Sequence, residues 1–269
     1  MAKSEGKGWS KGRTAANDSR VANNARAHTV MMYVRRTPPE NCKWPLSSIT
    51  TLPIEWSPEM AYIVGLTATD GCLLTGFRKI NFKSCDRDLV ALYLRLLGRT
   101  NRIKDAITRT GGIVYFTEFG DTRLYRWMLT IGLTPRKSLT LGAIDVPDDY
   151  LAATLRGLFE GDGNIENFVD RPTKRLYPNY RYERLRTNFN SASRRHLEWI
   201  QHRVALRFGL TGYLAQQPKR EGRHDFFRLR YSNKESVVLL SEMYPTSNVP
   251  KLERKWKIWN DYAKRHGLL

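Results

Sequence analysis

The spacing of apolar and polar positions divides residues 57–131 into alternating helical and extended segments. The first helix begins at Ser57-Pro58-Glu59, which provides an N-cap, a proline at the first helical position and an acid in the first turn, and it runs to Asp70. A hairpin around residues 75–76 leads into a strand at 78–84, where Ile80 and Phe82 alternate with polar residues. The pattern then predicts a helix opened by Asp86, strands at 102–109 and 112–119, and a short helix opened by Asp121.

The same order of elements recurs later in the chain. Asp148 or Asp149 is expected to cap a helix that ends at Asp162, and Ser193 to open a helix that Gly209 ends. Strands are predicted near 164–169, 180–190, 212–217 and 225–231, and two further helices near 234–243 and 251–265. Two helix–strand–strand–helix–strand–strand–helix units predict an α+β fold, with residues 46–140 in the first half and 141–269 in the second.

Two internal matches indicate that the halves arose by duplication. Residues 63–71 (IVGLTATDG) and 155–163 (LRGLFEGDG) share Gly, Leu, Asp and Gly at identical offsets, and residues 81–87 (NFKSCDR) resemble 188–194 (NFNSASR). The copies are 92 residues apart at the first match (162 − 70) and 107 apart at the second (188 − 81). The second half should therefore carry an insertion of 15 residues, which we place around 170–180. A repeat of this length indicates a duplicated domain.

The repeated segment places an acid and a glycine at the end of each helix. Gly65 and Gly157 are small residues on one face of each helix, so the two helices can pack closely side by side. Asp70 and Asp162 would then meet at two negatively polarised helix ends, where their carboxylates repel each other unless a cation lies between them.

Two adjacent carboxylates are hard oxygen ligands and predict a divalent-cation site. Mg2+ is the expected ion, Mn2+ or Ca2+ could substitute in binding, and the backbone carbonyls of Thr69 and Gly161 could complete the ligand set. For either copy alone, an Asp-Gly pair that merely ends a helix is a sufficient interpretation. The matching second copy favours the paired-acid interpretation.

The charge balance points to a polyanionic partner for this site. The chain of 269 residues has 45 Lys and Arg against 26 Asp and Glu, a formal net charge of +19 and a pI near 10.1, which favours nucleic acid. No apolar run approaches the ~20 residues of a membrane span, and the N-terminus lacks the apolar core of a secretory signal. A cytoplasmic or organellar location is therefore expected. Three cysteines without CxxC spacing argue against a zinc finger.

The N-terminal region differs from the rest of the chain. Residues 1–45 are basic and lack apolar periodicity, so they are expected to form either a disordered tail or an arm that contacts phosphates. Part of this region, Gly8 to Arg13, is similar to short Trp-x-Lys/Arg-Gly DNA-binding modules.

The polar faces of the predicted strands are rich in Arg, Lys and Asn. A two-stranded ribbon fits the DNA major groove, where Arg reads guanine and Asn reads adenine. A solvated sheet face is the alternative, against which the excess of Arg and Asn over Glu counts. The expected DNA-binding residues are Lys79, Asn81, Lys83, Arg184, Arg186, Asn188, Asn190, Arg228 and Arg230.

The duplicated motif resembles that of the LAGLIDADG homing endonucleases in their single-chain, two-motif form, over about residues 57–265. The second copy keeps the first acid of the family motif in Phe159-Glu160-Gly161, whereas the first copy has Thr67-Ala68-Thr69 there. The last acid, which the family uses for metal, is present in both copies as Asp70 and Asp162. The resemblance implies two αββαββα halves related by a pseudo-twofold axis, whose sheets form a saddle over double-stranded DNA.

The resemblance also implies an activity and its residues. The expected protein is a monomer that cleaves both strands of a long asymmetric site across the minor groove and leaves 3′ overhangs. The family places a basic residue near each cleavage site: we expect Lys137 at one, and Lys251, with Lys255 as the alternative, at the other. Any of these lysines could instead contact a phosphate or be solvated. The expected catalytic set is Asp70, Asp162, Lys137 and Lys251.

Two other functions are compatible with the sequence. One is a non-catalytic DNA-binding regulator on the same fold, and the other is an RNA maturase that assists intron splicing, since RNA is also polyanionic. Retention of both acids favours a nuclease encoded in an intron or another mobile element.

Overall fold

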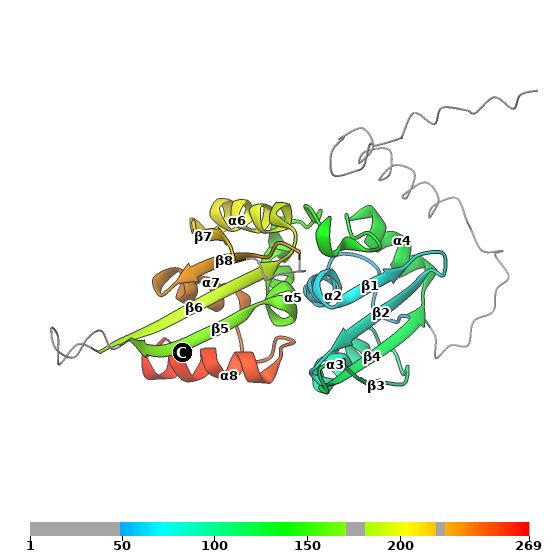
Figure 1. Cartoon of the computed structure of the whole chain (residues 1–269), viewed down its shortest axis with the longest axis horizontal. Helices are drawn as coiled ribbons and strands as arrows, with labels where there is room; N and C mark the ends of the chain where they lie inside the picture. Colours follow the sequence, from blue (N-terminus) through cyan, green and yellow to red (C-terminus); the bar gives the residue numbers. More distant parts are fainter. Residues whose placement is uncertain (1–48, 171–180, 219–223, 269) are drawn as a thin grey trace, which may run out of the picture. The chain divides into compact units, whose positions relative to one another are not determined.

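The computed structural model describes residues 49–170, 181–218 and 224–268, which belong to one compact unit (Figure 1). The predicted basic extension, residues 1–45, and residues 171–180 of the predicted insertion lie outside the described residues. The predicted boundary between the halves, at 140/141, stays a prediction.

The first half contains the predicted helices and strands in the predicted order. Its four strands form one antiparallel sheet in the order β1-β2-β4-β3. The elements are α2 (Pro58–Thr69), β1 (Gly71–Leu74), β2 (Lys79–Ser84), α3 (Arg87–Leu96), β3 (Lys104–Ile107), β4 (Ile113–Gly120) and α4 (Thr122–Thr130). Two 3-10 turns, η2 (Lys137–Leu139) and η3 (Asp148–Tyr150), lead into the second half.

The second half repeats this topology and adds a C-terminal helix. Its sheet has the order β5-β6-β8-β7, so each strand occupies the place of its counterpart in the first sheet. The elements are α5 (Leu151–Asp162), β5 (Asn164–Asp170), β6 (Tyr182–Ser191), α6 (Arg194–Phe208), β7 (Tyr213–Gln216), β8 (Phe227–Ser232), α7 (Lys234–Met243) and α8 (Glu253–Arg265). The predicted α+β fold of two αββαββα halves is confirmed.

The helix starts follow the predicted capping residues in part. Ser57 Oγ accepts a hydrogen bond from the Met60 amide at 3.1 Å, as an N-cap should. The prediction that Asp148 or Asp149 caps α5 is wrong, because α5 begins at Leu151 after η3 and its N-cap residue, Tyr150, makes no side-chain cap. Asp148 instead accepts a hydrogen bond from Arg203 at 2.8 Å.

Asp86 and Ser193 stand at the predicted N-cap positions of α3 and α6, but neither side chain caps its helix. The Asp86 carboxylate instead accepts three hydrogen bonds from Arg254, at 2.8, 3.0 and 3.1 Å. Ser193 Oγ donates to the Leu141 carbonyl at 2.5 Å. Asp86 therefore joins α3 of the first half to α8 of the second.

Helices α2 and α5 pack against each other between the two sheets (Figure 1). A Cβ atom added at Gly65 would lie 2.7 Å from the Leu158 amide nitrogen and 2.8 Å from Gly157 Cα. A Cβ atom added at Gly157 would lie 2.9 Å from the Leu66 amide nitrogen and 3.0 Å from Gly65 Cα. Because each glycine meets the equivalent atoms of the other helix, the packing is reciprocal, as a pseudo-twofold axis requires.

Each sheet buries one face and leaves polar residues on the other. Ile80 and Phe82 of β2 are fully buried, and so are Leu185 of β6, Leu229 and Tyr231 of β8. The alternation predicted for β2 is confirmed, and Leu229 and Tyr231 of β8 likewise alternate with less buried residues. No helix in the described residues has both the length and the apolar character needed to cross a membrane.

Candidate active site

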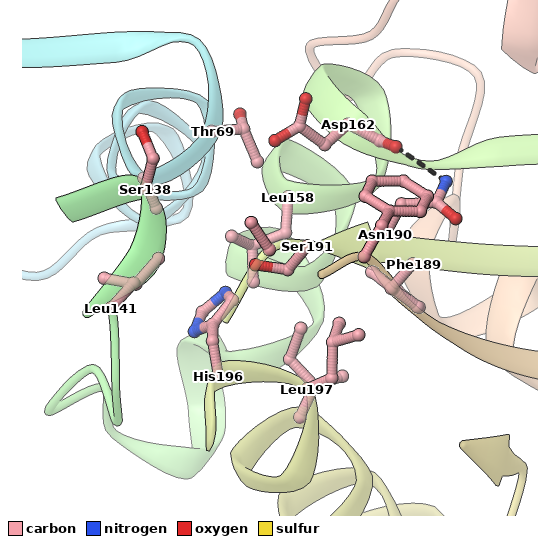
Figure 2. Close-up of a pocket in the computed structure, with 14 residues that line it drawn as sticks. Thr69, Ser138, Leu141, Leu158, Asp162, Phe189, Asn190, Ser191, His196 and Leu197 are labelled. Carbon is pink, nitrogen blue, oxygen red and sulfur yellow. Dashed lines mark hydrogen bonds between the residues drawn. The ribbon is translucent and has the colours of Figure 1, made fainter. Parts of the chain in front are cut away.

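The two predicted acids lie at the ends of the packed helices. Asp70 is the C-cap residue of α2, and Asp162 is the last residue of α5. The helix ends are in contact, since a Cβ atom added at Gly161 would overlap the side chain of Thr69, which lies near Asp162 in Figure 2. Packing of α2 on α5 thus brings the two carboxylates to one place, as the repeated motif predicted.

The surroundings of both carboxylates disfavour their charged forms. Burial, and next the charge of Asp162, raise the pKa of Asp70 from 3.8 to about 7. Burial also raises the pKa of Asp162. Without a counter-ion, the pair is therefore held at an electrostatic cost, which a cation between the carboxylates would relieve.

Lys137 and Lys255 occupy equivalent positions beside the two acids. Lys137 Nζ donates a hydrogen bond to the Gly71 carbonyl, and Lys255 Nζ donates to the Gly163 carbonyl at 2.6 Å. Gly71 and Gly163 are matching glycines of the repeat, 92 residues apart. The side chains are buried, and burial lowers the pKa of each lysine to about 8.

Lys251, the lysine assigned from the sequence, lies elsewhere. Its Nζ donates to the Ser247 carbonyl at 2.6 Å and is 3.3 Å from the Glu253 carboxylate. In the structure, Lys255 therefore occupies the position equivalent to that of Lys137. The sequence does contain a signal that favours Lys255, because an Arg-Lys pair occurs at residues 136–137 and again at 254–255.

The positive charges of both lysines act on both acids. Against the effect of burial, Lys255 lowers the pKa of Asp70 more than Lys137 does. Lys137 in turn lowers the pKa of Asp162 more than Lys255 does. Both lysines therefore influence both acids, across the junction between the halves.

The donor set at this junction fits a hard divalent cation. It consists of two carboxylates and two carbonyls in the last turns of α2 and α5, those of Thr69 and Gly161; carbonyls in the last turn have no partner within their helix. No cluster of three or more His, Cys, Asp or Glu side chains that could hold a metal occurs in the described ranges. A bound ion would therefore depend on these two acids, on carbonyls and on water or substrate oxygens.

A buried network fixes the position of Lys255. Glu160 is almost fully buried and accepts hydrogen bonds from the hydroxyls of Tyr62 and Tyr244, the latter at 2.8 Å. It also accepts from the Leu252 amide at 2.8 Å, just before α8. Lys255, in the first turn of α8, then reaches three carbonyls at the end of α5, at 2.6, 2.7 and 2.8 Å. The role of Glu160 was not predicted.

A cavity of about 250 Å³ lies beside Asp162 (Figure 2). Its floor is apolar and includes Leu158, Phe189 and Leu197. His196 lines it as a neutral imidazole at pH 7, since burial lowers its pKa to about 4, and its Nδ1 lies 2.8 Å from the Gly142 carbonyl.

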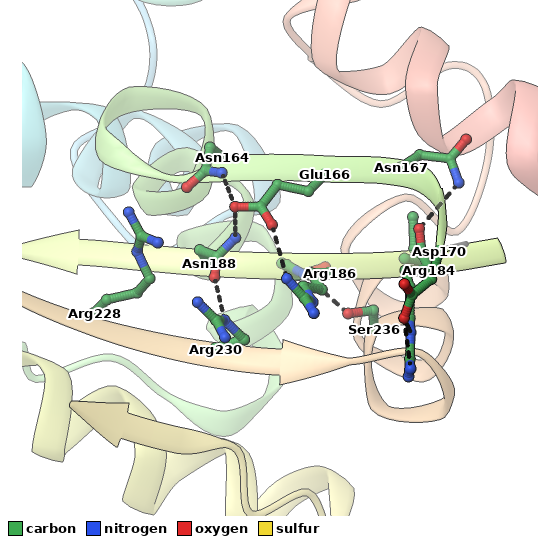
Figure 3. A network of polar contacts seen from close by, with 12 residues as sticks. Asn164, Glu166, Asn167, Asp170, Arg184, Arg186, Asn188, Arg228, Arg230 and Ser236 are labelled. Atoms are coloured by element: carbon green, nitrogen blue, oxygen red, sulfur yellow. Dashed lines mark hydrogen bonds and ion pairs between the residues drawn. The ribbon is translucent and has the colours of Figure 1, made fainter. Parts of the chain in front are cut away.

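The polar face of the second sheet carries a linked set of side chains (Figure 3). Asn188 is fully buried, whereas the other predicted contacts on this sheet are partly exposed. Hydrogen bonds and ion pairs connect neighbouring strands through Asn188–Glu166, Asn188–Arg230, Asn190–Asn164, Asn190–Arg228, Arg186–Glu166 and Arg184–Asp170.

The polar face of the first sheet is simpler. Asn81 is partly exposed and Lys83 is exposed, as predicted. Lys79 forms an ion pair with Glu118 on the neighbouring strand at 2.9 Å.

Known proteins share this architecture. Residues 149–243 match the model of the LAGLIDADG-like domain. The homing endonuclease I-WcaI, bound to its DNA recognition sequence, is similar with a TM-score of 0.51 over 82% of this chain and 95% of that chain, at 10% identity. No curated protein matches the chain.

Two further solved structures are similar at a lower level. I-DmoI in complex with DNA and Ca has a TM-score of 0.49 over 76% of this chain and 97% of that chain, at 14% identity. Full-length DUF199/WhiA from Thermatoga maritima has a TM-score of 0.46 over 80% of this chain and 64% of that chain, at 13% identity. The two antiparallel sheets and the likeness to I-WcaI give a pseudo-dimeric LAGLIDADG-type fold.

Proposed function

We propose that this protein is a site-specific, divalent-metal-dependent homing endonuclease that hydrolyses one phosphodiester bond in each strand of double-stranded DNA. One observation supports it most: two acids, Asp70 half-buried and Asp162 exposed, end a reciprocally packed helix pair, and each half places a buried lysine at that end. The structural likeness to I-WcaI, a homing endonuclease bound to its DNA recognition sequence, agrees with this proposal.

Asp70 and Asp162 would hold the cation, together with the carbonyls of Thr69 and Gly161. A divalent cation in such a site lowers the pKa of attacking water and stabilises the leaving oxygen. The repulsion between the two carboxylates favours binding of the cation, because a positive charge between them relieves that repulsion. Mg2+ is the expected ion.

Lys137 and Lys255 would stabilise negative charge that develops on the scissile phosphates. Both are held by backbone carbonyls, so their ammonium groups need little reorganisation during the reaction. With a pKa of about 8, each is mostly protonated at pH 7 and can still exchange a proton with water near Nζ. Each half thus supplies one acid and one lysine to the proposed centre.

The sheets would supply the DNA-binding surface. The net charge of +19 supports binding to a polyanion. Arg and Lys side chains project from the polar face of both sheets. Because both halves belong to one chain and differ in sequence, we propose a monomer that binds a long asymmetric site and cleaves across the minor groove, leaving 3′ overhangs.

Selection of cleaved duplexes from a randomised DNA library in Mg2+ tests this function. We expect one enriched site, cut in both strands. Asp70→Asn and Asp162→Asn should abolish cleavage while leaving binding of that site within a few-fold of wild type in Ca2+. Lys251→Met serves as a matched lysine control, since Lys251 lies outside the acid–lysine cluster.

The alternative functions give different outcomes in the same experiment. Selective binding without a cut, in Mg2+, Mn2+ and every other divalent ion tried, refutes the nuclease and supports a DNA-binding regulator. Preferential binding of intron RNA with stimulated splicing supports a maturase.

A further inference from the structure

Two arginines on the second sheet, Arg228 and Arg230, are held in a common way, which Figure 3 shows for Arg230. Arg228 Nε donates to Asn190 Oδ1 at 3.1 Å, and Arg230 Nε donates to Asn188 Oδ1 at 3.4 Å. In both cases the arginine on β8 and the asparagine on β6 are direct cross-strand partners. One arrangement therefore occurs twice, two residues apart along the same strand.

The asparagines cannot turn over to present other groups. The Asn188 amide nitrogen donates to the Glu166 carboxylate at 3.2 Å, and that of Asn190 donates to the Asp162 carbonyl at 2.9 Å. Since these partners are acceptors only, each nitrogen faces them and each oxygen faces its arginine. The side-chain amides of Asn188 and Asn190 therefore form hydrogen bonds within the protein, and we do not expect them to contact adenine.

The two arginines keep the rest of their donors available. A guanidinium has five N–H groups, and within the described residues the structure gives Arg228 and Arg230 no hydrogen bond besides the one from Nε. Arg184 and Arg186, on the same face, differ because ion pairs with Asp170 at 3.0 Å and with Glu166 at 3.6 Å engage them. Of these four arginines, only Arg228 and Arg230 combine an anchored guanidinium with free Nη groups.

We infer that Arg228 and Arg230 each read a guanine in the major groove, and that Asn190 and Asn188 are their positioning residues. This inference rests on the proposed DNA recognition. The free Nη groups of an anchored guanidinium match guanine O6 and N7, and a bidentate contact of this kind discriminates against other bases. Fixing Nε beforehand removes part of the side-chain entropy that binding would otherwise cost.

The geometry sets the spacing and order of the two guanines. Residues two apart on a strand are about 6.7 Å apart, which equals about two base-pair steps of roughly 3.4 Å. Arg228 is the nearer to the cleavage centre, because its partner Asn190 also bonds the Asp162 carbonyl. The site should therefore contain two guanine contacts about two base pairs apart, with Arg228 specifying the inner one.

Binding-site selection with the full chain in Ca2+ tests the assignment. We expect the guanine pair in one half of the enriched site, and a preference of about 5- to 150-fold over other bases at each position. Arg228→Lys should remove the preference at the inner position only, and Arg230→Lys at the outer position only. Both variants keep their charge, so the salt dependence of binding should stay unchanged.

Arg194→Lys is the matched control, because Arg194 lies on α6, outside both sheets, and pairs with Glu198 at 2.8 Å; it should leave both preferences intact. An enriched, cleaved site that lacks the guanine pair, or lysine variants that retain both preferences, overturns this assignment and leaves the nuclease standing. A site with the guanine pair that is never cut supports the assignment and refutes the nuclease. A library without any enriched sequence overturns both.

Discussion

Replacement of Gly157 by alanine tests the helix contact that brings the two acids together. The added methyl group would meet the Leu66 amide nitrogen at 2.9 Å and Gly65 Cα at 3.0 Å, and it would lie closer still to the Tyr62 carbonyl oxygen. All three are backbone atoms, so no side chain can rotate away. Helices α2 and α5 must separate by roughly 1 Å before these contacts become ordinary ones.

The expected loss of stability follows from two opposing effects. Overpacking of a rigid core costs about 1–3 kcal/mol, and the backbone obstacles here place Gly157→Ala at the upper end of that range. Alanine is the better helix former, by about 1 kcal/mol. We therefore expect a net loss of about 2 kcal/mol in the free energy of unfolding, or about 4–8 °C in Tm for a domain of this size.

Urea unfolding followed by tryptophan fluorescence, together with thermal melts, measures this loss. Gly120→Ala is the matched control, because a Cβ atom there meets nothing within 4 Å. Gly65→Ala should cost as much as Gly157→Ala, since the contact is reciprocal. The double variant should cost less than the sum, because one separation of the helices accommodates both methyl groups. A Gly157→Ala protein as stable as the Gly120→Ala control refutes the close packing of α2 on α5.

Three further outcomes are expected. The pKa of Asp70 is raised from 3.8 to about 7, so in metal-free protein its contribution to stability is greatest below pH 4 and is lost as the pH rises towards 7. Asp70→Asn should therefore raise Tm relative to wild type above pH 7 and not below pH 4. Equal Tm differences at both pH values would contradict this. Lys255→Met should slow cleavage by about 100-fold or more, against little change for Lys251→Met, in single-turnover assays of the selected site; the reverse order would return the assignment to Lys251. The affinity for DNA should fall steeply with salt: a plot of the logarithm of the binding constant against the logarithm of the salt concentration should have a slope of about −0.9 for each phosphate contacted. Fluorescence anisotropy from 50 to 200 mM salt measures this slope, and a flat response would exclude a phosphate-binding surface.

Local patterns account for the elements that the sequence predicted correctly. Alternation of Ile80 and Phe82 with polar residues placed β2, because side-chain direction in a strand has a period of two. Ser57 with Pro58 located the start of α2, because a cap acts within three residues. The acidic cap expected for α5 failed because Asp148 has a more distant partner, Arg203. Such competition from another helix leaves no trace in the local pattern.

By itself, the amino-acid sequence determined the duplicated unit, the acid at the end of each central helix and the strongly basic character of the chain. These features are readable because each depends on neighbouring residues, on a repeat or on a sum of charges. Only the tertiary structure decided between Lys255 and Lys251, enclosed Glu160 and turned Asn188 towards Glu166 and Arg230. Those outcomes depend on segments between 22 and 92 residues apart, whose contacts are set by how α2, α5, α8 and the strands pack.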